Sequence, residues 1–167
     1  MTKYKFNYDQ ATTLTYGNRQ APKQLTTILN LGCVDTQNWW LLNQAALFEA
    51  VDQGQLVLHL KFWSKVKPAL MNGNVANGYV DYQHPTAALA FIQAVFQQQA
   101  ALRALTTTAV PAYLQTTFQV QPYPEAMAVQ QQIDREILDN GITSVPTLIM
   151  AGKAYFDEQL LPIEQLL

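Results

Sequence analysis

The distribution of apolar residues divides the first half of the chain into strands and a helix. Mostly apolar runs over residues 25–31 and 56–62 predict two buried strands. Between them, apolar residues at helical spacing from Cys33 to about residue 52 predict an amphipathic helix that ends at Gly54. Strand, helix and strand in this order predict a βαβ unit with parallel strands.

Aromatic and polar residues alternate near the N-terminus, over residues 2–8. This period of two predicts an edge strand with Tyr4, Phe6 and Tyr8 on its inner side. Residues 12–16 are expected to pair with this strand as the second half of a hairpin.

The second half of the chain has a helical period until its last quarter. We expect helices over residues 84–105, 110–118 and 126–140. The Asn- and Gly-rich stretch over 71–79 is expected to be irregular or weakly helical. At the end of the chain, the pattern predicts a β-hairpin over 145–156 and a closing helical turn or two over 162–167.

Composition and charge narrow the classes of function. The 167 residues are 49% hydrophobic and 13% charged, with a net charge of −2, which predicts a single packed domain over residues 1–167. This charge gives no indication of a nucleic-acid partner, and no run approaches the about 18 apolar residues of a membrane helix. The first residues lack the apolar core of a signal peptide, so we expect a cytoplasmic protein.

The chain has one cysteine, Cys33, so any disulfide must join it to another molecule. Histidine and carboxylate residues lack the spacing of metal ligands, and no metal site is expected. Cys33 lies where a predicted strand passes into a helix, and the free N–H groups and dipole of a helix start favour an accessible, reactive thiolate. The alternative is a small buried apolar side chain, which is common for free cysteines.

Two segments carry a resemblance to a known family: ILNLGCVDTQNWW over residues 28–40 and GITSVPTLIMAGKAYF over 141–156. They resemble the Cys-x-x-Cys segment and the cis-proline loop of the DsbA-like branch of the thioredoxin-fold family. The resemblance implies an α/β (α+β) thioredoxin fold with a helical insertion at about 65–141, between the βαβ and ββα halves. It also implies a cis peptide bond before Pro146, which faces the cysteine, and a Val145 backbone offered to an extended partner strand.

The chain departs from this family at three positions. Its motif is Cys33-Val34-Asp35-Thr36, so threonine stands where the second cysteine would be and cannot resolve a mixed disulfide. Thr27 stands where relatives often carry a buried acid. The Asp35 carboxylate suits the helix dipole but repels a nearby thiolate, so it opposes the effect of the helix start.

The candidate catalytic residues are Cys33 and Thr36, whose hydroxyl would either bond to the sulfur or cap the helix. Trp39 and Trp40 are adjacent and cannot share a helix face, so we expect one in the core and the other beside the cysteine. The candidate substrate-binding residues are Val145, Pro146, Trp40 and Asp35.

Two classes of function stay open. The first is thiol–disulfide exchange by a monothiol, as an oxidoreductase or a thiol transferase. Its mixed disulfide with a protein or small thiol would be resolved by an outside thiol, with no cofactor other than a low-molecular-weight thiol as co-substrate. The second is a redox-inactive protein whose groove binds peptides or a partner, or supports a homodimer. The presence of Cys33 favours the first class, whereas Thr36 and Thr27 favour the second.

Overall fold

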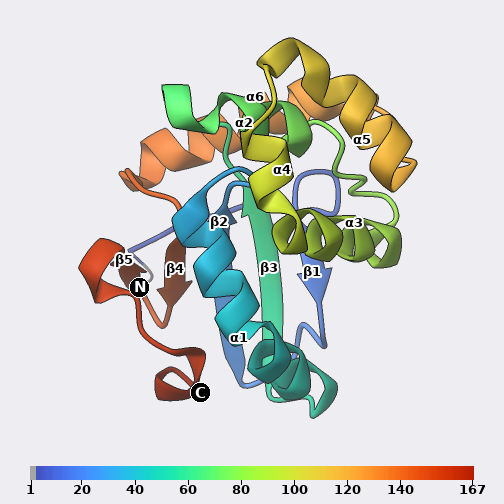
Figure 1. Ribbon diagram of the computed structural model, residues 1–167. Coiled ribbons are helices and arrows are strands. Elements are labelled where there is room, and N and C mark those ends of the chain that lie inside the picture. The colour runs from blue at the N-terminus through green and yellow to red at the C-terminus, as the bar shows by residue number, and fades with distance from the viewer. Residues whose placement is uncertain (1–2) are drawn as a thin grey trace.

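The computed structural model describes residues 3–167. These residues form a mixed five-stranded sheet with helices on both of its faces (Figure 1). The strands are β1 (Leu14–Tyr16), β2 (Lys23–Leu29), β3 (Leu56–Phe62), β4 (Thr147–Met150) and β5 (Lys153–Phe156). They lie in the order β1-β3-β2-β4-β5, with β2 and β3 parallel and the other neighbouring pairs antiparallel.

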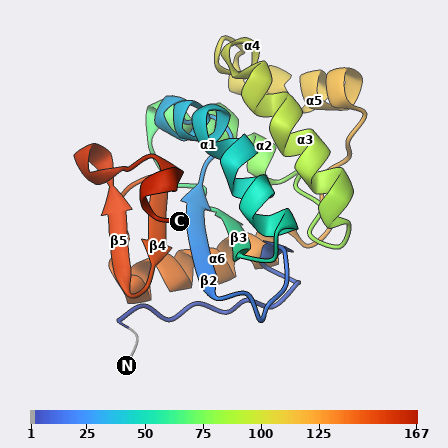
Figure 2. The ribbon, with the colours of Figure 1, turned by 90° about the horizontal axis from the view of Figure 1, so that it is seen from below.

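The helices cover the two faces of the sheet unequally. The α-helices of the described residues are α1 (Val34–Asp52), α2 (Met71–Asn77), α3 (Pro85–Gln97), α4 (Gln99–Arg103), α5 (Val110–Phe118) and α6 (Ala126–Asn140). Short 3-10 turns are η1 (Pro68–Leu70), η2 (Thr107–Ala109), η3 (Asp157–Gln159) and η4 (Ile163–Gln165). Helices α1 and α3 lie over one face and α6 crosses the other (Figure 2). Within residues 3–167, no helix has the length and apolar character needed to cross a membrane.

The βαβ unit that the apolar runs predict is confirmed. β2 and β3 pair in parallel and α1 connects them, although β2 begins and ends two residues earlier than expected. Along β3, Leu58 and Leu60 belong to the hydrophobic cluster that also contains Trp40 of α1. Lys61, the residue after Leu60, points to the other face, where it contacts α6. The strand is buried along its whole length because a separate layer covers each face.

A buried ion pair joins β3 to α6. Lys61 Nζ lies 2.9 Å from Glu136 Oε1, and both side chains are nearly inaccessible to solvent. Lys61 Nζ also donates to the Asn7 carbonyl (2.6 Å) and the Thr13 hydroxyl (2.7 Å), so its three donors are all used. Burial lowers the pKa of Lys61, and the neighbouring Glu136 carboxylate opposes that shift. Water does not solvate this ion pair, so the hydrogen bonds to the Lys61 ammonium group stabilise it instead.

The predicted edge strand over residues 2–8 is wrong for the residues that the structure describes, and residue 2 lies outside them. Residues 3–8 form no strand and pass beneath the sheet near α6 (Figure 2). The Lys5 N–H donates to Asn140 Oδ1 (2.8 Å), and the Asn7 N–H donates to Glu136 Oε2 (2.6 Å). Because side chains of α6 accept these backbone donors, the segment is held without a neighbouring strand.

The expected hairpin partner of this segment pairs elsewhere. Residues 14–16 form β1, which lies antiparallel to β3 at the edge of the sheet. Tyr4, Phe6 and Tyr8 are nevertheless the half-buried residues of this segment, as the alternation predicts. Tyr4 and Phe6 pack against the hydrophobic core, and Tyr8 stacks on His59. The period of two thus predicted correctly which side chains face inward, but it wrongly predicted that the segment is a strand of the sheet.

The helical part of the chain follows the expected order with one correction. The helix expected over 84–105 is two helices, α3 and α4, because the chain leaves the helical conformation at Gln98 (φ −122°, ψ 23°). The stretch over 71–79 contains the short helix α2, and α5 and α6 have the expected bounds. The terminal hairpin forms between β4 and β5, and the closing turn is η4.

Two glycines bring α2 against the turn that precedes α1. A Cβ atom at Gly32 would lie 2.7 Å from both the N and Cα atoms of Gly73, and one at Gly73 would lie 2.6 Å from Gly32 Cα. Carbon atoms in proteins do not pack this closely, so both positions require glycine. The helical insertion thus docks backbone to backbone on the turn that carries Cys33.

His59 is buried in the sheet face that α6 covers. Its ring stacks on Tyr8, with 4.0 Å between ring centroids, and its Nδ1 lies 2.8 Å from the Thr15 hydroxyl. Burial lowers the pKa of His59 to about 4, and the positive charges of Arg19 and Lys61 act in the same direction. His59 is therefore neutral in the folded protein at neutral pH.

We expect Gly73→Ala to destabilise the fold and disturb the cysteine turn together. The added methyl group overlaps the backbone of Gly32, and such overpacking typically costs about 1–3 kcal/mol. Urea denaturation would measure the loss of stability, and alkylation of the Cys33 thiol would report the displaced turn. Gly78→Ala is the matched control, because a Cβ there would lie no closer than 3.2 Å to its neighbours. Equal stability of the two variants would contradict the close packing.

Acid should destabilise the protein through His59. The unfolded chain binds a proton at this histidine below about pH 6.5, whereas the folded chain does so only near pH 4. The contribution to stability is therefore complete above about pH 6.5 and is lost as the pH falls towards 4, by up to about 3 kcal/mol. Urea denaturation at several pH values should find this loss in wild type and in His84→Gln, but not in His59→Phe. The same loss in His59→Phe would refute the assignment.

Candidate functional site

Cys33 is the N-cap residue of α1. β2 ends at Leu29, and a buried turn over residues 30–32 leads to the cysteine. The Cys33 sulfur accepts a hydrogen bond from the Thr36 N–H (3.4 Å), and the Cys33 carbonyl accepts one from the Gln37 N–H (3.0 Å). The sulfur thus takes the place of the side-chain oxygen that usually caps a helix start.

The Cys33 thiol faces the loop before β4. Its Sγ donates a hydrogen bond to the Val145 carbonyl (3.4 Å), and the Val145–Pro146 peptide bond is cis. The Thr147 hydroxyl donates to the Ser144 carbonyl (2.7 Å) and closes this loop. Two segments that lie 112 residues apart in the sequence therefore meet at the sulfur.

The exposure of Cys33 is lower than the sequence led us to expect for a reactive thiol. The residue is 8% exposed, so its accessibility is that of the alternative, a buried cysteine. The sulfur lies between the start of α1 and the Val145 carbonyl of the opposite loop. A partner that approaches the sulfur must therefore contact α1 and the Val145 loop at the same time.

Thr36 is buried, and its hydroxyl has no hydrogen-bond partner within residues 3–167. Neither of its two expected roles is realised in this structure, because its backbone N–H contacts the Cys33 sulfur and that sulfur caps the helix. Thr27, where relatives often carry a buried acid, is also buried, and its hydroxyl donates to the His59 carbonyl (3.0 Å). Neither threonine supplies a charge to the site.

Side chains of α2 hold the turn before Cys33. Asn30 Oδ1 accepts from the Gly32 N–H (2.9 Å), and Asn30 Nδ2 donates to Asn74 Oδ1 (2.8 Å). Asn77 Oδ1 accepts from the Leu31 N–H (3.2 Å). The insertion therefore satisfies polar groups of the turn that would otherwise be buried without partners.

Gln99, the first residue of α4, also holds this turn. Its Nε2 donates to the carbonyls of Leu31 (2.8 Å) and Cys33 (3.0 Å). Arg103 Nε donates to Gln99 Oε1 (3.0 Å) and fixes the orientation of the amide. The break between α3 and α4 at Gln98 sets the direction in which α4 leaves, and Gln99 is fully buried as a result. The role of Gln99 has no signal in the sequence, because a single glutamine in a Gln-rich stretch resembles its neighbours.

The assignment of Trp40 to the binding site is wrong. Trp40 is 0% exposed and packs among the aromatic rings of Phe48, Phe96 and Trp39. The neighbouring Trp39 is also buried, but it lines a groove beside the Val145 loop. Adjacent helix positions are about 100° apart, and the sequence does not say which of the two faces inward.

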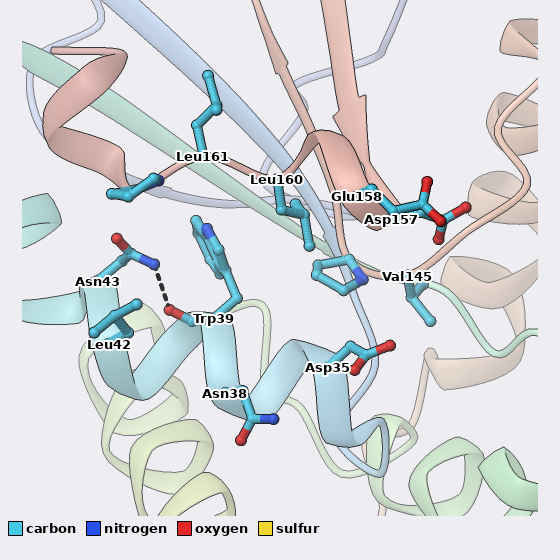
Figure 3. Close-up of a pocket in the computed structure, with 12 residues that line it drawn as sticks. Asp35, Asn38, Trp39, Leu42, Asn43, Val145, Asp157, Glu158, Leu160 and Leu161 are labelled. Atoms are coloured by element: carbon cyan, nitrogen blue, oxygen red, sulfur yellow. Dashed lines mark hydrogen bonds between the residues drawn. The ribbon is translucent and has the colours of Figure 1, made fainter.

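The groove lies between α1 and the C-terminal part of the chain and has a volume of about 690 Å³ (Figure 3). Its α1 wall consists of Asp35, Asn38, Trp39, Leu42 and Asn43. The opposite wall consists of Val145, Pro146, Asp157, Glu158, Leu160, Leu161 and Pro162. Three of the expected substrate-binding residues, Val145, Pro146 and Asp35, therefore lie together. The segment after β5 was not identified from the sequence, since its residues carry no motif.

Within the described residues, no group of three or more histidine, cysteine, aspartate or glutamate side chains could hold a metal ion. The chemistry that the arrangement offers is that of a sulfur at a helix start. An N–H donor at 3.4 Å and a carbonyl acceptor at 3.4 Å lie on either side of it. In its thiolate form, such a sulfur is a nucleophile.

Comparisons with solved structures agree on the fold. A conserved protein of unknown function from Enterococcus faecalis V583 is 27% identical, with a TM-score of 0.86 over 98% of this chain and 90% of that one. The catalytic domain of Proteus mirabilis ScsC is 14% identical, with a TM-score of 0.69 over 95% and 87%. Oxidised BdbD from Bacillus subtilis is 12% identical, with a TM-score of 0.61 over 89% and 86%. No curated protein matches the chain.

A family model described as thioredoxin matches residues 9–166, which is nearly the whole chain. The order of strands and helices in the structure agrees with this match and places helices α2 to α6 between the βαβ unit and the terminal hairpin. The chain therefore belongs to the thioredoxin family, and it has threonine at position 36, where the resemblance places a second cysteine.

Proposed function

We propose that the protein performs thiol–disulfide exchange through Cys33, acting as a monothiol. The observation that carries this proposal is the position of the sulfur. It accepts the Thr36 N–H at the start of α1 and contacts the Val145 carbonyl. Hydrogen bonds and the dipole at a helix start stabilise a negative charge on sulfur. The solved structures described as a catalytic domain and as an oxidised protein share the fold that presents this sulfur.

The reaction is an exchange without net oxidation. The Cys33 thiolate attacks one sulfur of a partner disulfide, a new S–S bond forms to Cys33, and the other partner sulfur leaves as a thiolate. The chain has no second cysteine, so an outside thiolate must then attack the mixed disulfide. When the outside thiolate attacks the partner sulfur, Cys33 leaves as a thiolate and the partner is joined to the outside thiol. A further exchange with a second outside thiol then reduces the partner.

The Val145 loop has a role in docking the partner. In the thiol form, the Val145 carbonyl accepts the S–H of Cys33. Loss of the proton frees this carbonyl to accept an N–H from an extended partner segment, in the way that a strand adds to an exposed edge. Deprotonation of the sulfur and docking of the partner would then favour one another.

A redox-inactive binding protein is the second candidate. The 8% exposure of Cys33 and the threonine at position 36 favour it, because both limit exchange. In this case the groove between α1 and the Val145 loop would bind a peptide or partner without covalent chemistry. The two candidates differ in whether the folded structure activates the sulfur or shields it.

Reaction with a neutral disulfide probe separates the two candidates. With 2,2′-dipyridyl disulfide at about pH 6, an ordinary thiol of pKa about 8.5 is almost entirely protonated and reacts slowly. We expect native protein to react about tenfold faster than the same protein unfolded in urea, because the helix start stabilises the thiolate. The release of pyridine-2-thione would give the rates, and mass spectrometry would identify the mixed disulfide.

Cys33→Ser is the control for this measurement, since it removes the only thiol of the chain. A native protein that reacts more slowly than the unfolded one would show that the fold shields the sulfur. That result would overturn the exchange proposal and leave the binding protein.

The Thr36 hydroxyl should matter for exchange and not for stability. We propose that it turns to the sulfur when the thiol loses its proton, since it has no partner within residues 3–167 in the thiol form. Thr36→Val keeps the shape and the N–H, so exchange should slow by about three- to tenfold, equivalent to one hydrogen bond of about 1 kcal/mol. Urea denaturation should find the stability unchanged or raised, because no hydrogen bond of the resting form is lost.

Thr36→Ser retains a hydroxyl and is the matched control, with an expected exchange rate close to that of wild type. Equal rates for Thr36→Val and Thr36→Ser would show that only the backbone of this residue contributes.

A further inference from the structure

The groove has carboxylates on both of its walls. Asp35 stands on the α1 wall, and Asp157 and Glu158 stand on the opposite wall (Figure 3). All three are exposed. No lysine, arginine or histidine lines the groove, and within residues 3–167 none of these carboxylates forms an ion pair. The groove is therefore a site of uncompensated negative charge in a chain whose net charge is only −2.

Apolar side chains lie between these charges. Leu42 is 75% exposed on the α1 wall, which is high for a leucine of a folded chain. Leu160 and Leu161 line the opposite wall, next to Pro162. An exposed leucine that faces other leucines across a groove offers a surface for an apolar side chain of a partner.

A buried donor points into the same groove. Trp39 is 5% exposed, and its indole projects from α1 towards Leu160 and Leu161 (Figure 3). Its Nε1 is buried and has no acceptor within residues 3–167. A buried N–H without an acceptor is unfavourable, so a ligand that supplies one would be stabilised by it. A backbone carbonyl of an extended peptide is such an acceptor.

We propose that the groove selects an extended polypeptide segment with lysine or arginine side chains next to an apolar side chain. This inference rests on the proposed function, in which Cys33 meets a disulfide presented at the groove. The cationic side chains would lie between Asp35 on one wall and Asp157 and Glu158 on the other, and the apolar side chain would pack on Leu42. The peptide backbone would accept the Trp39 N–H.

The same charges disfavour other occupants. Glutathione carries two carboxylates and one ammonium group, so its net negative charge is repelled by the groove. A second copy of this chain would bring its own net charge of −2. Among the partner classes considered for Cys33, a basic segment of a protein is thus the one whose charge complements the groove.

The test uses cysteine-free peptides, so that binding is measured apart from exchange. Three peptides would share an apolar centre and differ only in their flanking residues, which are lysine, glutamine or glutamate. Titration into the reduced protein should give about tenfold tighter binding of the lysine peptide than of the glutamine peptide at low ionic strength. The glutamate peptide should bind most weakly, and about 1 M salt should remove the differences.

Variants assign the preference to the groove. The double substitution Asp157→Asn and Glu158→Gln should reduce the preference for lysine to about twofold or less. The double substitution Glu49→Gln and Asp52→Asn removes two exposed carboxylates at the far end of α1 and should retain the preference. Each pair of substitutions removes the same charge, so net charge alone cannot explain a difference.

Three results would overturn the inference. They are equal binding of the lysine and glutamine peptides, retention of the preference after the Asp157 and Glu158 substitutions, and competition by glutathione as effective as by the lysine peptide. Selective binding combined with a Cys33 that the fold shields would support the groove ligand and remove the exchange chemistry.

Discussion

The site depends on hydrogen bonds to a short stretch of buried backbone, residues 30–33. A turn between a strand and a helix leaves N–H and C=O groups without regular partners, and here they are shielded from water. Two side chains of the insertion supply partners, Asn77 of α2 and Gln99 of α4. Asn74 of α2 holds the Asn30 side chain, whose Oδ1 accepts the Gly32 N–H. The position of the Cys33 sulfur is thus set by helices that follow it in the chain by about 40 to 70 residues. The close approach of Gly32 and Gly73 is the steric counterpart of the same arrangement.

This arrangement gives the insertion a structural purpose that is separate from contact with a partner. The groove beside Cys33 is lined by α1 and the C-terminal segment, and none of its residues belongs to α2 to α6. The insertion therefore holds the turn from one side, while a partner would approach from the other. Substitutions in the insertion would change the position of the Cys33 sulfur by displacing the turn. Substitutions after β5 would change the groove alone.

Much of the fold could be predicted from the sequence. The apolar runs of β2 and β3 and the period of α1 have strong local signals, and the two motif segments fixed the order of the remaining parts. The meeting of Cys33 with Val145 could be inferred from the family resemblance but not from the residues alone. The N-terminal segment was misassigned because alternation indicates which side chains face inward, not whether a strand or α6 lies beside them. Trp40 was misassigned because two adjacent tryptophans give the helix no preferred face.

The site residues that the sequence did not reveal act through tertiary placement. Gln99 resembles the other glutamines of its helix until the break at Gln98 is known. Asp157 and Glu158 read as ordinary charged residues after a strand until the chain folds back across α1. In both cases the residue type is common, and its role comes from a contact with a distant segment.

The N-terminal segment has a consequence for where the folded unit begins. The family model starts at residue 9, but the Asn7 carbonyl is one of the acceptors around the buried Lys61, and the Asn7 N–H bonds to Glu136. A shortened chain that began at the family boundary would leave an ammonium group in the interior with one ligand missing and a carboxylate without its amide donor. The physical boundary of this molecule therefore lies ahead of the one that sequence similarity marks.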